Sequence, residues 1–202
     1  MRYYEDATFG NLVGAIKKMS DIADAYDGEA GFIVYYSGLG AVDEKTKERY
    51  LLPSDASLAS LSSTGYSVQA LQKNLETMKT VYTLAIFDAP FSNIDKEGKA
   101  LKASRGVAIA PQKVSTGGNV VICMGSGNEE TSYSSKKYGH GLLTFALLKE
   151  LQSTRGNCSM KELLNSAVSW VSKESLNLYD KMQTPLIEMS VEMKSKWNNL
   201  KF

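Results

Sequence analysis

The chain has 202 residues, 43% of them hydrophobic and 22% charged, which is typical of a globular domain and excludes a disordered segment. Its 23 basic and 22 acidic residues leave a net charge of +1, so neither nucleic acid nor a membrane surface is a favoured partner. Two cysteines and one histidine are too few for a structural zinc site, which needs about four such ligands. No apolar run approaches the roughly 18 residues of a membrane span, and no signal peptide is visible. We therefore expect one soluble domain over residues 1–202, with no cofactor or metal, in a compartment that the sequence leaves open.

Helical periodicity marks the first predicted element, over residues 7–26, with Asp6 or Thr8 as its N-cap. The uncharged run 31–36 follows, and we predict a parallel strand that is buried on both faces and ends in a Gly-x-Gly turn at residues 38–40. After a charged loop over residues 43–49, we predict a short edge-like strand at 50–53 that proline ends. Residues 54–66 are rich in serine and predicted to be irregular.

The second half alternates helices and strands. Ser67 is predicted to cap a helix, and a second buried strand covers residues 81–87. Beyond a long segment at 92–118, the further predictions are a strand at 120–124, a helix at 139–151, a helix that Ser159 and Glu162 open and that runs to about residue 173, and a strand at 184–189. This alternation predicts an α/β fold, a mostly parallel sheet with helices on both faces. Loops at strand C-termini carry the chemistry in such sheets, so the turns after residues 36 and 87 are expected to lie together.

These two turns carry short motifs. Residues 32–40 read Phe-Ile-Val-Tyr-Tyr-Ser-Gly-Leu-Gly, and residues 88–93 read Asp-Ala-Pro-Phe-Ser-Asn. They resemble YSGHG and DACFSG, two motifs of the caspase-like cysteine peptidases, peptidase family C14. Further matches follow in the family's order at residues 50–53, 105–109, 139–145 and 183–185. Together they resemble the bacterial caspase/metacaspase branch. The resemblance implies a three-layer αβα sandwich in which the family's N-terminal strand and helix are absent.

The resemblance also implies a catalytic dyad, whose histidine and cysteine positions are occupied here by Leu39 and Pro90. The histidine of such a pair accepts the thiol proton and stabilises the thiolate. Leucine cannot transfer a proton, and proline has neither a nucleophile nor an N–H group. The family's oxyanion hole is implied to use the N–H groups of the cysteine and of the glycine after the histidine, here Gly40. Losing one such donor costs about 3 kcal/mol of transition-state stabilisation. We therefore predict no catalytic residue and no peptide hydrolysis by the family mechanism.

Three residues around the lost dyad stay candidates for substrate binding: Asp88, Ser37 and Gly40. In the basic-specific members of the family, the aspartate that matches Asp88 helps line a pocket for Arg or Lys. The resemblance thus implies that Asp88 could hold a cationic side chain without cutting, and the alternative is that it only caps a turn or pairs locally. Gly40 could still offer its N–H group. Ser37 would need a base to act as a nucleophile, and none is evident.

His140 and Cys123 are the candidate replacements for the base and the nucleophile. His140 falls in a different family motif at the start of a helix, which favours a structural role. Cys123 lies in an apolar strand, where a cysteine usually behaves as a small hydrophobic residue. The basic residues between 96 and 113 fall in the region that active relatives process. That region is either cleaved in trans by an active protease or a solvated loop.

The leading hypothesis is a catalytically inactive caspase-like domain that acts by binding. Its partner would be a protein or peptide: an active caspase-like relative, a basic peptide at Asp88, or a second copy across an exposed sheet edge. The rival hypothesis is an active cysteine endopeptidase that cleaves after Arg or Lys with a nucleophile other than the family's. A third is a degenerate fragment without a selected role, which the missing first strand suggests.

Overall fold

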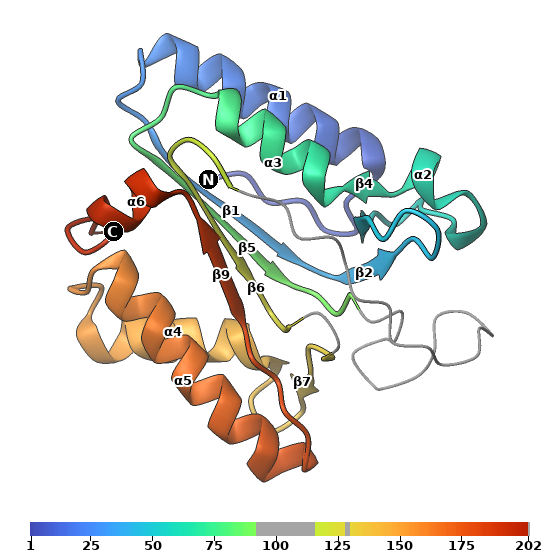
Figure 1. The fold of residues 1–202 in the computed structure, drawn as a ribbon, viewed down its shortest axis with the longest axis vertical. Coiled ribbons are helices and arrows are strands. Elements are labelled where there is room, and N and C mark those ends of the chain that lie inside the picture. Colours follow the sequence, from blue (N-terminus) through green and yellow to red (C-terminus); the bar gives the residue numbers. More distant parts are fainter. Residues whose placement is uncertain (92–115, 128–129, 202) are drawn as a thin grey trace.

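The computed structural model describes residues 1–91, 116–127 and 130–201, and a four-stranded sheet forms its centre (Figure 1). The strands are β1 (Gly31–Ser37), β5 (Tyr82–Asp88), β6 (Val120–Met124) and β9 (Leu186–Met189), in the order β1-β5-β6-β9. The first three are parallel, and β9 joins β6 in the antiparallel direction. The predicted α/β class and mainly parallel sheet are confirmed.

Helices cover both faces of this sheet (Figure 1). On one side lie α1 (Phe9–Ala25) and α3 (Val68–Thr77), and on the other α4 (Leu142–Thr154) and α5 (Met160–Tyr179). Side chains of a strand point alternately to its two faces. Leu84 and Ile86 of β5 accordingly pack with α4 and α5, whereas Ala85 and Phe87 pack with α3. The core is therefore two apolar layers with the sheet between them.

The helix ends follow from their caps. Thr8, and not Asp6, caps α1: its side chain accepts from the Asn11 N–H, and the Asn11 side chain accepts from the Thr8 N–H. The predicted capping box of Ser159 and Glu162 opens α5, which runs to Tyr179, beyond the predicted end. A short helix that was not predicted, α6 (Val191–Lys196), follows β9.

A second, three-stranded sheet stands beside the C-terminal ends of β1 and β5. It is made of β2 (Leu39–Val42), β3 (Arg49–Leu52) and β4 (Tyr66–Ser67), with β3 in the middle, so the prediction of an edge-like strand at 50–53 is wrong. The region predicted to be irregular contains η1 (Leu58–Ser60) and α2 (Leu61–Thr64), and a two-stranded sheet of β7 (Ser134–Ser135) and β8 (His140–Gly141) precedes α4. Tyr36 ties the large sheet to the small one by donating to Leu39 O and Leu52 O, at 2.9 and 2.8 Å. Burial raises the pKa of this phenol to about 12.

The prediction that β1 is buried on both faces is wrong. Its residues alternate between exposed and half-buried, and Ile33 and Tyr35 keep 55% and 48% of their surface exposed. The cause is its position, because β1 is the first strand of the sheet and no strand in the described part of the chain pairs with its outer edge. Within the described residues, β1 is also the first strand along the chain.

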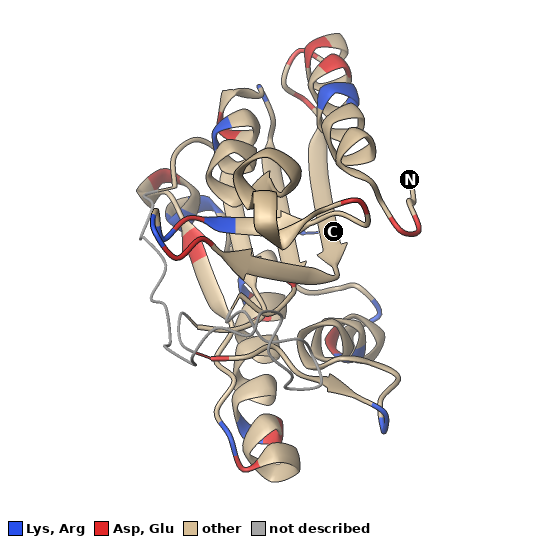
Figure 2. Cartoon of the chain, turned by 90° about the vertical axis from the view of Figure 1, so that its right-hand side faces the viewer, with Lys and Arg blue, Asp and Glu red and all other residues tan. Residues whose placement is uncertain are grey.

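Basic and acidic residues alternate along the described ribbon, with neither sign confined to one element (Figure 2). Across the described ranges, no helix is long and apolar enough to cross a membrane, and no group of three His, Cys, Asp or Glu side chains could hold a metal ion. Most of the segment predicted at 92–118, with its basic residues and the motif at 105–109, lies outside the described residues.

Candidate functional site

The turns that follow β1 and β5 are in direct contact. The parallel register pairs Ser37 with Asp88 at the ends of the two strands. Beyond them, the Gly40 N–H donates to the Pro90 carbonyl oxygen at 3.1 Å. A Cβ atom at residue 40 would lie 2.6 Å from the Phe91 ring and 2.9 Å from that same oxygen, so only glycine fits this approach. The sequence prediction that the two turns lie side by side is confirmed.

This contact uses the hydrogen-bonding group that the sequence left open. From the sequence, Gly40 could still offer its N–H group to an oxyanion, and in the structure that N–H donates to Pro90 O. Residue 90 is itself a proline and has no N–H to offer. Leu39 is half-buried and Pro90 is buried, and both side chains are purely apolar. The junction of the two turns is therefore closed by a backbone bond and lined by groups that cannot move a proton.

Asp88, the last residue of β5, lies two residues before Pro90 and is 0% exposed. One carboxyl oxygen accepts from Ser132 Oγ at 2.9 Å, and the other accepts from Thr144 N at 3.1 Å and from the Thr144 hydroxyl. Thr144 is in the first turn of α4, whose N-cap residue, Gly141, has no side chain that could cap it. Asp88 therefore caps α4 from a neighbouring strand.

Gly141 explains how the start of α4 can come so close to this carboxyl group. A Cβ atom at residue 141 would lie 2.6 Å from the Asp88 Cγ. The motif at 139–145 thus supplies both the glycine that permits the approach and the threonine that bonds Asp88. The sequence indicated this motif as a family match, but no signal in it predicted a contact with Asp88.

Gln183 extends the polar cluster beneath the turns. Its side chain is 0% exposed, donates to Gly125 O at 2.7 Å and to Ser132 Oγ at 3.4 Å, and accepts from the Tyr133 N–H at 2.9 Å. Ser132 thus joins Gln183 to Asp88, a role that no sequence motif indicated. The motif at 183–185 placed Gln183 correctly within the resemblance but gave no partner for it.

The two candidate replacement groups lie in different surroundings. Cys123 of β6 is 0% exposed, and its burial, together with the negative charge of Asp88, raises the pKa of its thiol to about 12. A thiol with that pKa is protonated at neutral pH and is a poor nucleophile. His140 is exposed and belongs to β8, opposite Ser135.

The fold and these turns define an α/β domain of the caspase-like class. A family model described as the caspase domain, Peptidase C14, matches residues 1–194, and the chain belongs to that family. No curated protein matches the chain.

Solved structures agree on the fold. A protein of Geobacter sulfurreducens superposes with a TM-score of 0.61 at 13% identity, over 96% of this chain and 78% of its own. Caspase-1 of Spodoptera frugiperda superposes with a TM-score of 0.55 at 15% identity, over 88% of this chain and 67% of its own.

Proposed function

We propose that this caspase domain does not cleave peptides and acts by binding another protein. The observation that carries the proposal is the bond from Gly40 N–H to Pro90 O, which occupies one oxyanion donor at the place where the other is missing. An acyl-transfer site needs donors aimed at the developing oxyanion, a nucleophile and a base. The turns at Leu39 and Pro90 supply none of the three.

The rival function, peptide cleavage by a replacement nucleophile, is disfavoured by the surroundings of Cys123. A nucleophilic cysteine needs a lowered pKa and access to the substrate, but this thiol has a raised pKa and no exposed surface. Ser37 lies on the exposed side of β1, and nothing beside it in the sequence can act as a base.

A basic peptide held by Asp88 is a second form of the binding role, and the geometry does not favour it. Both oxygens of Asp88 already accept hydrogen bonds, and the side chain is fully enclosed. A Lys or Arg side chain would have to displace Ser132 or Thr144 to reach it. We therefore assign Asp88 to holding α4 in place, and we propose that partners bind elsewhere on the domain.

Fluorogenic peptides that end in Arg or Lys test the proposal. We expect no turnover above that of a heat-denatured sample, and we expect both cysteines to resist a thiol reagent at pH 7.5 until the protein is unfolded, because both are buried. Turnover by the wild-type chain that Cys123→Ala abolishes would establish the rival function. Turnover that survives Cys123→Ala would also overturn the proposal and point to another nucleophile.

A further inference from the structure

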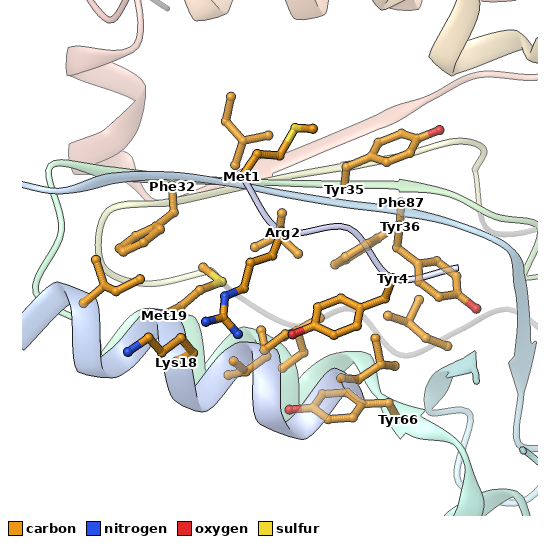
Figure 3. A pocket seen from close by; sticks show the side chains of 18 residues that line it. Met1, Arg2, Tyr4, Lys18, Met19, Phe32, Tyr35, Tyr36, Tyr66 and Phe87 are labelled. Atoms are coloured by element: carbon orange, nitrogen blue, oxygen red, sulfur yellow. The ribbon is translucent and has the colours of Figure 1, made fainter. Parts of the chain in front are cut away.

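The two helix layers of the domain present different surfaces. Beside α1, a hollow of about 510 Å³ has the chain's own Met1, Arg2 and Tyr4 among its walls (Figure 3). On the other side of the sheet, α4 and α5 lie side by side, and the β7–β8 hairpin leads directly into α4 (Figure 1). Aromatic and basic side chains meet where the hairpin and these two helices join, and we call this surface the α4–α5 seam.

Three aromatic rings of the α4–α5 seam pack against one another. Tyr138, in the hairpin turn, stacks on Phe145 of α4 with the ring centroids 4.2 Å apart. The Trp170 ring of α5 lies 5.4 Å from that of Tyr138 and 5.2 Å from that of Phe145. The Tyr138 hydroxyl donates to Glu174 at 2.5 Å, which holds the hairpin against α5. Because all three aromatic residues are only half-buried, each still shows part of its surface to solvent.

Two lysines adjoin these rings. The Lys149 ammonium nitrogen lies 5.2 Å from the centroid of the Trp170 ring, which is within reach of a cation–π interaction. Lys173 is exposed three residues after Trp170 and therefore lies on the same side of α5. Neither lysine has an ion-pair partner among the described residues. The α4–α5 seam thus combines partly exposed aromatic rings with two cations that no carboxylate neutralises.

The acidic groups of the same surface are engaged within the domain. The Glu174 carboxyl group accepts from the Tyr138 hydroxyl, lies 3.5 Å from the Lys137 ammonium nitrogen and keeps only 16% of its side chain exposed. The hydrogen bond from Tyr138 is the main cause that lowers the pKa of Glu174, so this group is ionised at neutral pH. Glu150 accepts from the Ser166 hydroxyl at 2.7 Å. The charge left for a partner is that of the lysines, which favours an anionic partner.

The aromatic rings narrow the class of anion. A small inorganic anion would use the two lysines and leave the rings exposed to water. Nucleic acid is held by many phosphate contacts along a basic track, and the net charge of this chain is only +1. A protein segment with an apolar residue between acidic ones would use the charges and the rings together.

We propose that the α4–α5 seam binds an acidic segment of another protein. Carboxylates of that segment pair with Lys149 and Lys173, and an apolar side chain between them covers the exposed parts of Phe145 and Trp170. Burial of the aromatic surface supplies affinity, and the two cations select an acidic partner. The inference rests on the proposed binding function and names its surface and its partner chemistry.

Selection from a displayed library of random dodecapeptides against the immobilised chain tests the proposal. We expect enrichment of peptides that carry Asp or Glu on both sides of an apolar residue. The Lys149→Glu/Lys173→Glu double variant should bind the selected peptides at least tenfold more weakly in fluorescence anisotropy. Lys161→Glu is the matched control, because Lys161 is exposed on α5 but lies about two and a half turns before Trp170 and on the opposite side of the helix. Its effect should stay within twofold.

Trp170 gives a readout that a general effect of charge would not move. A bound carboxylate should draw the Lys149 ammonium group away from the indole ring, and an apolar side chain should cover that ring. Adding a selected peptide should therefore change the tryptophan fluorescence of the wild-type chain and leave that of Trp170→Phe unchanged. The other tryptophan, Trp197, is buried and 8% exposed, so it contributes a constant background.

Several outcomes would overturn the proposal. They are no enrichment over the double variant, enriched peptides without acidic residues, and binding that leaves the fluorescence of Trp170 unchanged. Inorganic phosphate or a DNA oligonucleotide that changes this fluorescence at lower concentration than the peptides would assign the surface to another anion. A dimer in sedimentation that the double variant dissociates would assign it to a second copy. Peptide cleavage by the wild-type chain would refute the proposed function but not this surface, so the two failures are distinguishable.

Discussion

β1 and β5 are neighbouring parallel strands with similar sequences and very different surroundings. Up to its last residue, each is an uncharged run that contains β-branched and aromatic residues, and each ends in a motif turn. In β5 every residue after the first is buried, whereas β1 alternates between exposed and half-buried residues. At their paired ends, Asp88 is 0% exposed and Ser37 is exposed. Two differences in position cause this: β5 has a strand on each side and helices packed on both faces, whereas β1 has one neighbouring strand in the described chain and an uncovered face at Ile33 and Tyr35.

The comparison separates a buried, hydrogen-bonded strand end from an exposed one. At the end of β5, both carboxyl oxygens of Asp88 accept hydrogen bonds, one from Ser132 and the other from Thr144. We call these three residues the polar floor, and its hydrogen bonds need no bound substrate. The β1 side instead keeps exposed apolar surface at Ile33 and Tyr35. The two strand ends that the family's motifs follow therefore differ in burial and in polar contacts.

Restoring one residue in each turn gives the largest expected effect. Leu39→His together with Pro90→Cys returns the base, the nucleophile and the N–H of residue 90, and cleavage of a mixed panel of fluorogenic peptides should rise at least about tenfold above background, a modest part of the gain that such groups give together. Each single variant should stay at background, because base and nucleophile act as a unit. Fluorogenic peptide turnover measures it. A folded double variant with no activity would contradict the idea that these turns keep a usable framework.

Truncating a core residue on each strand tests the comparison through stability. Leu84→Ala on β5 removes a side chain that is 0% exposed and should lower the free energy of unfolding by about 3 kcal/mol. Ile33→Ala on β1 should cost about 1 kcal/mol or less, because 55% of that side chain is exposed. Urea denaturation followed by circular dichroism gives both values. Equal losses would mean that β1 is covered in solution.

Sequence signals for helix ends predicted the fold better than those for strand positions in the sheet. Caps are local, so the start of α5 at Ser159 and Glu162 could be predicted from the residue types alone. The apolar runs predicted the strands, but an apolar run cannot say how many neighbours a strand has. For that reason β1 was predicted to be buried, and the strand at 50–53 was predicted to lie at an edge although β3 is central.

The site could be predicted only as far as its turns. The turns at the C-terminal ends of two parallel strands were predicted to lie together, and the family resemblance pointed to the same residues, 37–40 and 88–92. The hydrogen bond from Gly40 to Pro90 confirms this contact. The partners of Asp88 come from residues 44 and 56 positions further along the chain, Ser132 and Thr144, and no local pattern specifies such pairings. The bond that occupies the Gly40 N–H likewise depends on how closely two turns approach.

Removing the carboxyl group of Asp88 tests the rigid side of the comparison. Asp88→Ala leaves the Ser132 hydroxyl and the Thr144 N–H without their acceptor, and each buried group without a partner costs about 1–3 kcal/mol, whereas the Thr144 hydroxyl keeps its contact with the Tyr35 hydroxyl. The variant no longer has to bury a carboxyl group, which offsets part of this loss. We expect a net loss of about 2 kcal/mol by urea denaturation. Asp21→Ala, on the exposed face of α1, is the control and should not lower stability by more than about 0.5 kcal/mol. A neutral Asp88→Ala would contradict its assignment as the cap of α4.

The smallest expected effect on stability concerns the Thr144 hydroxyl, which contacts one residue of β1 and one residue of β5. Thr144 Oγ1 contacts both Asp88 and the Tyr35 hydroxyl, the latter at 2.7 Å. Thr144→Val removes a buried bond to a carboxyl group and should cost about 1.5 kcal/mol. Tyr35→Phe should change stability by less than about 0.5 kcal/mol, because Tyr35 is 48% exposed and water can replace its hydroxyl. The double variant should be additive within about 0.5 kcal/mol in a double-mutant cycle. A larger coupling would mean that β1 is held by the polar floor as firmly as β5, and the contrast between the two strands would then be one of exposure alone.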